Sequence, residues 1–123
     1  MEDDRVRRAI DCFNAKDYFA AHELLEESWR EAEAEVQPLY EAMIRIAVAL
    51  HLRVNRGARR GSLNLLQQAL VRLDDLRPVC ASIDTARLYD DVSAYAERLR
   101  AAPGPASLLE RFRLPVIRFA ERA

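Results

Sequence analysis

One short stretch of this sequence holds the side chains best suited to chemistry, and they recur at helical spacing. At 100° per residue, Tyr18, His22 and Trp29 share one arc of a helix, and Glu26 stands at the edge of that arc. His22 therefore lies in an apolar stripe one turn from a carboxylate, whereas Glu23 points elsewhere, toward solvent. An imidazole beside a carboxylate can exchange a proton, help to hold a metal ion or form a hydrogen bond in the core.

A second histidine extends this set. His51 follows the turn at Gln37 by 14 residues, and His22 precedes that turn by 15. In an antiparallel helical hairpin both then stand about 22 Å from the turn, at one height. If they face each other, His22, Glu26 and His51 form a ligand set suited to Zn, Mn or Fe, or an acid–base pair. The alternative, which an apolar stripe favours, is a core histidine hydrogen-bonded to Glu26 or Tyr18.

No catalytic signature accompanies these residues. The sequence has no HExxH, no four-carboxylate ExxH array, no CxxC, no P-loop and no nucleophile elbow. We therefore assign no catalytic residue and predict a non-enzymatic binding or interaction module. Its polar pocket is expected between the helices at 17–35 and 39–55, with His22, Glu26 and Trp29 in it. A metal-dependent enzyme or metal-binding protein, with a divalent ion on the two histidines and Glu26, is the alternative from another class.

A basic corner offers a third possibility. Arg53, Arg56, Arg59 and Arg60 surround the turn at Gly57, just before the next expected helix. A helix N-terminus with arginine side chains attracts phosphate or carboxylate groups, so this corner is a candidate anion site. A nucleic-acid reader normally adds net positive charge and interleaved aromatic residues, but this chain has a net charge of −1 and the corner lacks aromatics. Nucleic-acid binding is therefore disfavoured, and a solvated loop is the plain alternative.

Composition and periodicity predict an all-α fold. β-branched residues are scarce, Thr occurs once, and Ala and Leu dominate. Short loops make sequential helices antiparallel neighbours, so we expect an up-and-down bundle of about five helices, the first two resembling a tetratricopeptide-type hairpin. We expect Asp17 to cap the second helix, and Asp84 or Thr85 to cap the fifth. The expected helices are 3–14, 17–35, 39–55, 62–76 and 85–101.

Length and composition also restrict the class of protein. The 123 residues, half of them apolar, predict one helical domain, with a core at 3–101 and a C-terminal tail at 105–123 docked on it. No stretch approaches the roughly 20 apolar residues of a membrane span. The acidic N-terminus lacks the apolar segment of a secretory signal, and Cys12 and Cys80 are the only cysteines. We therefore expect a cytoplasmic protein without a disulfide framework and without a membrane partner.

The charge is divided unevenly along the chain. Residues 1–41 carry a net charge of −7, and residues 42–123 carry +6. Such a division is satisfied either by pairing of the two parts within one fold or by association between copies. We expect the partner to be a second copy, in a dimer or larger assembly, or another protein.

The segment Phe13-Asn14-x-x-x-Tyr18-Phe19-x-Ala21-His22-Glu23-x-Leu25-Glu26-x-x-Trp29-Arg30 resembles the signature of a bacterial and archaeal family, domain of unknown function 309. A second block, from Ile44 through His51 to Arg60-Gly61, is similar to another part of that family. The resemblance implies a small, mainly helical, cytoplasmic protein and no particular activity or cofactor. The polar residues that it points to are Asn14, His22, Glu23, Glu26, Trp29 and Arg30.

This chain departs from the family pattern in the third expected helix. Glu41, Ala42 and Arg45 stand where the family tends to have Gln-Gly-x-x-Gln. At i, i+4 spacing, Glu41 and Arg45 are expected to replace an amide network by an ion pair.

Overall fold

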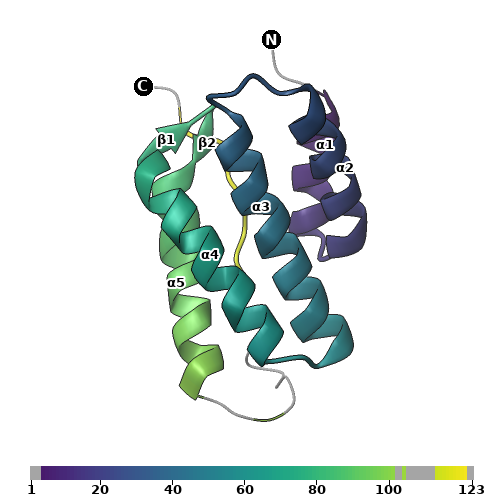
Figure 1. Ribbon diagram of the computed structural model, residues 1–123, viewed down its shortest axis with the longest axis vertical. Helices are drawn as coiled ribbons and strands as arrows, with labels where there is room; N and C mark the ends of the chain where they lie inside the picture. Colours follow the sequence, from purple (N-terminus) through teal and green to yellow (C-terminus); the bar gives the residue numbers. More distant parts are fainter. Residues whose placement is uncertain (1–3, 102–103, 105–112, 122–123) are drawn as a thin grey trace.

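The computed structural model describes residues 4–101, 104 and 113–121 of the chain. In this part the helices stand side by side, each packed against the next in sequence, with α3 in the middle (Figure 1). This arrangement confirms the predicted all-α, up-and-down bundle. The five α-helices are α1 (Asp4–Asn14), α2 (Tyr18–Glu31), α3 (Gln37–Leu50), α4 (Arg60–Leu76) and α5 (Thr85–Ala101).

The second helix begins where the sequence predicts. The Asp17 side chain accepts a hydrogen bond from the Ala20 amide at 3.3 Å, which is the predicted N-cap. The helix ends at Glu31, earlier than the predicted 35, because the Trp29 carbonyl is already bonded by two groups from beyond the helix. The Ala32 amide and the Gln37 side-chain amide both donate to it, at 3.3 and 3.0 Å.

The third expected helix does not continue unbroken to residue 55. After α3 the chain widens into a π-helix, η1 (His51–Asn55), and then turns at Gly57, whose φ of +75° favours glycine. The Ser62 hydroxyl donates to the Ala49 carbonyl at 2.8 Å, so this carbonyl has a partner outside its own helix. Short π-helical segments are frequent at functional sites, and this one begins at a predicted site residue, His51.

A two-stranded hairpin that the sequence does not predict separates α4 from α5. Strands β1 (Val79–Cys80) and β2 (Ile83–Asp84) pair antiparallel through a tight turn at Ala81 and Ser82, both with positive φ. Strands of two residues have no detectable periodicity, so pattern analysis misses them. The Asp84 side chain then accepts from the Arg87 amide at 3.0 Å and caps α5, as predicted.

The C-terminal segment, residues 113–121, contacts both the β2 strand and the end of α1. It runs behind α3 in the view of Figure 1 and pairs with the β2 strand, where Ile83 bridges Phe119. At its other contact, the Asn14 amide donates to the Ile117 carbonyl and the Asn14 side-chain oxygen accepts from the Ile117 amide, both at 2.9 Å. The rest of the predicted tail, 105–112 and 122–123, lies outside the described residues.

The core is centred on α3, as the sequence predicts from the apolar character of this helix around most of its circumference. Small buried residues, Ala9, Ala21 and Ser28, lie on α1 and α2, which pack closely. The more specific likeness of α1 and α2 to a tetratricopeptide-type hairpin stays a prediction. No helix in the described part of the chain combines the length and apolar character needed to cross a bilayer. The buried residues of α3 are Leu39, Ala42, Met43, Ile46, Ala47, Ala49 and Leu50.

Candidate functional site

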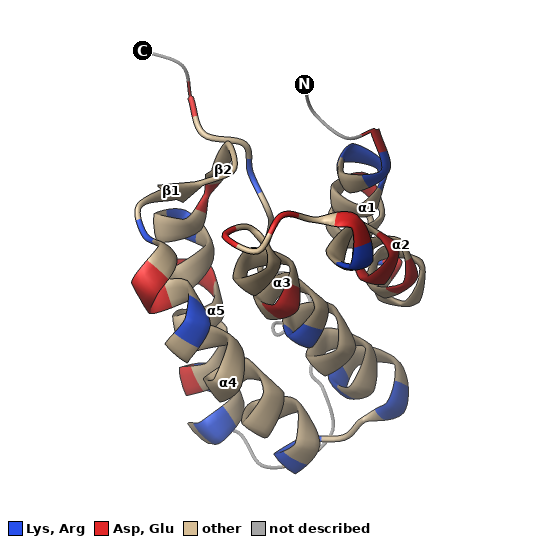
Figure 2. Ribbon diagram, turned by 45° about the horizontal axis from the view of Figure 1, so that its top comes forward, with Lys and Arg blue, Asp and Glu red and all other residues tan. Residues whose placement is uncertain are grey.

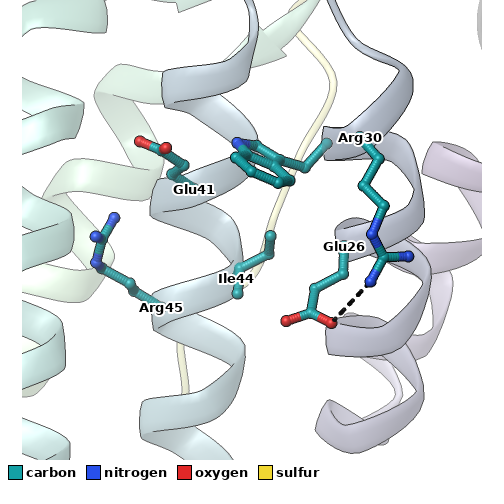
Figure 3. Close-up of a pocket in the computed structure, with 6 residues that line it drawn as sticks. Glu26, Arg30, Glu41, Ile44 and Arg45 are labelled. Atoms are coloured by element: carbon teal, nitrogen blue, oxygen red, sulfur yellow. Dashed lines mark ion pairs between the residues drawn. The ribbon is translucent and has the colours of Figure 1, made fainter.

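The face between α2 and α3 carries two pockets, which we call the upper pocket, lined by residues near the C-terminal end of α2, and the lower pocket, lined by residues near its N-terminal end. The upper pocket has a volume of about 310 Å³. Figure 3 shows Glu26 and Arg30 reaching into it from α2, opposite Ile44 of α3, while Glu41 and Arg45 extend to the other side of α3. Its lining residues are Glu26, Trp29, Arg30, Glu41, Ile44 and Arg45.

The lower pocket is smaller and almost entirely apolar. Its volume is about 190 Å³, and it is lined by Tyr18, Phe19, His22, Val48 and His51. The Phe19 ring lies 6.1 Å from the His22 ring and 5.8 Å from the His51 ring, measured between centroids. Phe19 is nevertheless 55% exposed, so a large aromatic side chain forms the outer edge of this pocket.

A hydrogen bond joins the two pockets. His22 Nε2 lies 3.0 Å from Glu26 Oε1, so a residue of the lower pocket contacts a residue of the upper pocket. His51 does not join this pair, because its Nδ1 lies 2.9 Å from the Asn55 amide nitrogen. Within the described residues no three His, Cys, Asp or Glu side chains are placed to hold a metal ion. His22 and His51 thus share a pocket, but with Glu26 they do not form a ligand set in this structure.

Trp29 has a buried polar atom without a hydrogen-bond partner in the part of the chain that the structure describes. Its indole Nε1 is buried, and no hydrogen-bond acceptor for it exists among the described residues. Beside it, the Arg30 guanidinium is 65% exposed, and its nearest charged partner is Glu26 Oε2, at 4.0 Å. Buried donors are nearly always paired in native proteins, so this indole N–H is an exception, and its burial keeps it out of contact with a ligand in the upper pocket.

Tyr18 forms the base of the lower pocket. The residue is 1% exposed, and its ring meets Phe13 edge-on at 5.3 Å between centroids. Burial raises the pKa of the Tyr18 phenol to about 12 from its ordinary 10.0, because the charged phenolate is disfavoured away from water. At neutral pH the phenol is therefore protonated and able to donate.

Two residues that the family resemblance points to lie away from the pockets. Asn14 binds the backbone of Ile117 through both its side-chain atoms, which makes it part of the contact to the C-terminal segment. Glu23 is exposed and lines neither pocket. Of the predicted pocket residues, the structure brings Tyr18, His22 and His51 to the lower pocket and Glu26, Trp29 and Arg30 to the upper one.

Two of the four arginines in the basic corner donate hydrogen bonds to backbone carbonyls, and the other two are exposed. Arg53 is 1% exposed and donates toward the Gly57 carbonyl at 3.4 Å. Arg59 donates to the carbonyls of residues 99 and 100, at 3.1 and 2.8 Å, which satisfies the end of α5. Arg56 and Arg60 are exposed. In Figure 2 acidic positions are frequent along the ribbon of α2, whereas basic positions are frequent where the chain passes from α3 to α4. The four arginines do not converge as an anion site expected from the sequence would require.

Sequence reasoning misses Phe19, Ile44 and Val48 as lining residues. An aromatic residue on the polar side of α2 is the available signal for Phe19. The expected ion pair between Glu41 and Arg45 is wrong, because both side chains turn to α4. Glu41 lies 3.7 Å from Arg72, and Arg45 Nε donates to Gln68 at 3.1 Å.

The fold and this site define a small helical-bundle protein with two adjoining pockets on one helix–helix face. Residues 6–65 match the model of the family described as "Domain of unknown function (DUF309)", the family whose signature the residues of α2 resemble. A relative from Aquifex aeolicus (strain VF5), named "Uncharacterized protein", is 35% identical over 71 residues, which cover 57% of this chain. The matched part is 21% of that relative, so this chain spans about a fifth of its length. No solved structure matches.

Proposed function

We propose that this protein is a non-enzymatic interaction module whose partner lies in the α2–α3 groove, the surface formed by the upper and lower pockets together. One observation carries the proposal: apart from Glu23, the signature residues of α2 outside the core gather on this face. Phe19, His22, Glu26, Trp29 and Arg30 all line one of the two pockets. Tryptophan, tyrosine and arginine are the residues that contribute most binding energy in protein interfaces.

The chemistry of the lower pocket supports a protein segment as the partner. Its lining is apolar, and Phe19 projects at its edge, so an aliphatic or aromatic side chain of a peptide fits there and covers exposed apolar surface. The π-helix that begins at His51 is the kind of local irregularity common at functional sites. In the Aquifex aeolicus relative the matched segment belongs to a much longer chain, which is in keeping with a domain that works joined to other parts.

The proposal is tested by selecting ligands from a library of random 12-residue peptides displayed on phage. We expect enriched peptides with an aliphatic or aromatic residue, which bind the wild type and lose binding to Phe19→Ala and to Trp29→Ala. The matched control is Val71→Ala on α4, because Val71 is 70% exposed and lines neither pocket. A library that yields no ligand, or ligands that bind all four proteins equally, would refute the proposal.

A second copy of the same chain can supply the partner, and we propose a cytoplasmic homo-oligomer as the simplest assembly. The acidic surface along α2 and the basic end near α3 and α4 supply complementary charge between copies (Figure 2). Sedimentation velocity at low and high salt measures whether the protein associates and whether charge contributes to the association. A dimer that Phe19→Glu converts to a monomer supports association through the groove, and a monomer at all concentrations excludes it.

A further inference from the structure

We propose that a pocket between α5 and the C-terminal segment binds a dianionic phosphate group, as in a phosphate monoester. This α5 pocket has a volume of about 370 Å³ and is lined by one face of α5 and by side chains within residues 113–118. It shares no lining residue with the α2–α3 groove, so the site is separate from the proposed function.

Two contacts hold the C-terminal segment on α5, with a space between them. At the first contact, Asp91 Oδ2 accepts from the Val116 amide at 3.4 Å and from Arg118 Nη1 at 2.9 Å. At the second contact, Arg98 Nη2 donates to the Arg113 carbonyl at 2.7 Å. Asp91 and Arg98 are seven residues apart, so they lie on the same face of α5, about 10 Å from each other along its axis.

The space between these contacts is open because a small side chain lies there. Ala94 falls between Asp91 and Arg98 on the same face of α5, is exposed and lines the pocket. Its methyl group fills little of the space, while the contacts at Asp91 and Arg98 fix the distance between helix and segment. The α5 pocket is therefore a cavity with charged side chains at both ends.

Positive charge is in excess on this lining. Three arginines line the pocket, and Asp91 is the one carboxylate among the described residues that do so. Arg118 lies 2.9 Å from Asp91, so these two charges compensate each other. The charges of Arg98 and Arg113 then have no counterion in the described lining, and two uncompensated guanidinium groups attract an anion.

Arg98 and Arg113 contribute to the site in different ways. Arg98 donates to a neutral carbonyl, which leaves its charge uncompensated, and the adjacent carboxylate, Glu97, pairs with Arg100 instead. Because Arg98 Nε is buried, this residue acts on the pocket through its charge rather than through that atom. Arg113 is exposed, and no hydrogen bond or ion pair engages its side chain within the described part of the chain, so it is the residue that can donate to a ligand.

A phosphate monoester matches this lining best. Guanidinium groups bind oxyanions through charge-assisted hydrogen bonds, and a dianion compensates two positive charges where a carboxylate or a sulfate ester compensates one. The same charges repel a cation. The volume exceeds that of a phosphate group, and Leu114 and Val116 offer apolar contact for the carbon atoms of the ester.

Two probes of nearly the same shape and different charge test the proposal on the full-length protein at pH 8 and constant ionic strength. Methyl phosphate is a dianion at this pH, whereas methyl sulfate is a monoanion. We expect methyl phosphate to shift the Ala94 and Leu114 resonances with saturation and methyl sulfate to bind about ten-fold more weakly. Equal binding by the two probes, or no saturable shift with methyl phosphate, would overturn the proposal.

Variants at two exposed positions separate charge from space. Arg113→Gln should weaken methyl phosphate binding about ten-fold, whereas the control Arg8→Gln, on α1 and outside the pocket, should leave it unchanged. Ala94→Glu puts a carboxylate among the arginines and should abolish binding, whereas Ala94→Gln, of nearly the same size and without charge, should retain it. Equal effects of the two arginine variants, or of the two variants of Ala94, would contradict the proposal.

A last comparison distinguishes the sources of the phosphate group. N-acetyl-phosphoserine amide represents a phosphorylated peptide, and glycerol 3-phosphate represents a small metabolite. Tighter binding of the first than of methyl phosphate supports the site with a protein as its ligand, and tighter binding of the second supports it with a small molecule. If both bind more weakly than methyl phosphate, the pocket does not admit the ester and the proposal is wrong.

Discussion

His22 Nε2 and Glu26 Oε1 lie 3.0 Å apart, and through this contact the lower pocket touches the upper one. Both side chains are partly exposed, so the pair contributes little to the free energy of unfolding, about 1 kcal/mol or less. Its role is better described as positional, because it joins a side chain that lines the lower pocket to one that lines the upper pocket. We therefore expect the two pockets to respond to each other's occupants.

The first prediction concerns that coupling. We expect His22→Ala to lower the free energy of unfolding by no more than about 1 kcal/mol, because the residue is neither core nor capping. The same change frees Glu26 to rotate, so a selected peptide that contacts the upper pocket should bind more weakly although His22 does not line that pocket. His22→Gln, which restores a donor to Glu26, is the control and should bind like the wild type. Equal binding by all three proteins would show that the pockets are independent.

The second prediction concerns metal ions. A ligand bound only to the folded state at a hundred times its dissociation constant adds about 2.7 kcal/mol to stability. We expect Zn²⁺, Mn²⁺ and Fe²⁺ to leave the melting temperature unchanged, because His22 pairs with Glu26 while His51 pairs with Asn55. The measurement is a thermal melt of wild type beside His22→Ala. A rise with one metal that His22→Ala abolishes would restore the metal-centre hypothesis.

The third prediction concerns alkaline pH. The pKa of Tyr18 is about 12 in the folded protein and 10.0 for a solvated tyrosine, so the folded state holds the phenolic proton more tightly. Stability from this group is therefore complete below pH 10 and is lost as pH rises toward 12, by about 3 kcal/mol in all. Urea denaturation at pH 8, 10 and 11 should show this decline. In Tyr18→Phe the decline should be shallower, and an equally steep one would assign it to other groups.

The fourth prediction concerns the contact between Asn14 and Ile117. Asn14→Ala removes two hydrogen bonds, so we expect a loss of about 1–3 kcal/mol in the free energy of unfolding. Amide exchange should accelerate at Ala120 and Asp84, whose amides bond between the C-terminal segment and the β2 turn. Asn14→Asp retains the acceptor but loses the donor, so its effect should be intermediate or larger through repulsion from the Ile117 carbonyl. Unchanged exchange in both variants would show that the segment docks without Asn14.

The fifth prediction separates the arginines of the basic corner. Arg59→Ala leaves two carbonyls at the end of α5 without their charged donor, which should cost about 2 kcal/mol of stability. Arg60→Ala is the matched control at the neighbouring exposed position, and it should change stability by less than about 0.5 kcal/mol. Urea denaturation of both variants measures the difference. Equal effects would mean that Arg59 acts as a solvated surface charge.

Much of the fold follows from the sequence because α-helical periodicity is strong in this chain. The Asp17 cap, the Asp84 cap and the central place of α3 all follow from local patterns. The π-helix at His51 does not, and the Ala49 carbonyl just before it accepts a hydrogen bond from Ser62 of α4, 13 residues further along the chain. Sequence patterns within one helix contain no information about a hydrogen-bond partner that another helix supplies.

The site is partly predictable for the same reason. His22 and Glu26 are one turn apart, so their contact follows from helix geometry alone. The relation of His22 to His51 depends on the rotation of α3 against α2, which sequence does not set, and the structure places Phe19 against both rings. Glu41 and Arg45 have an obvious local partner in each other, but groups on α4 compete successfully for both.

The contact between Asn14 and Ile117 joins residues 103 positions apart. It closes almost the whole described chain into one loop, whereas the helix pairs of the bundle are neighbours in sequence. Loop closure of this length is entropically expensive and contributes to folding only after the helices are in place. During synthesis the Asn14 side chain at the end of α1 therefore remains hydrogen-bonded to water until residue 117 has left the ribosome. The helices can assemble progressively from α1 onward, whereas the contact between Asn14 and Ile117 forms only after residue 117 has been made.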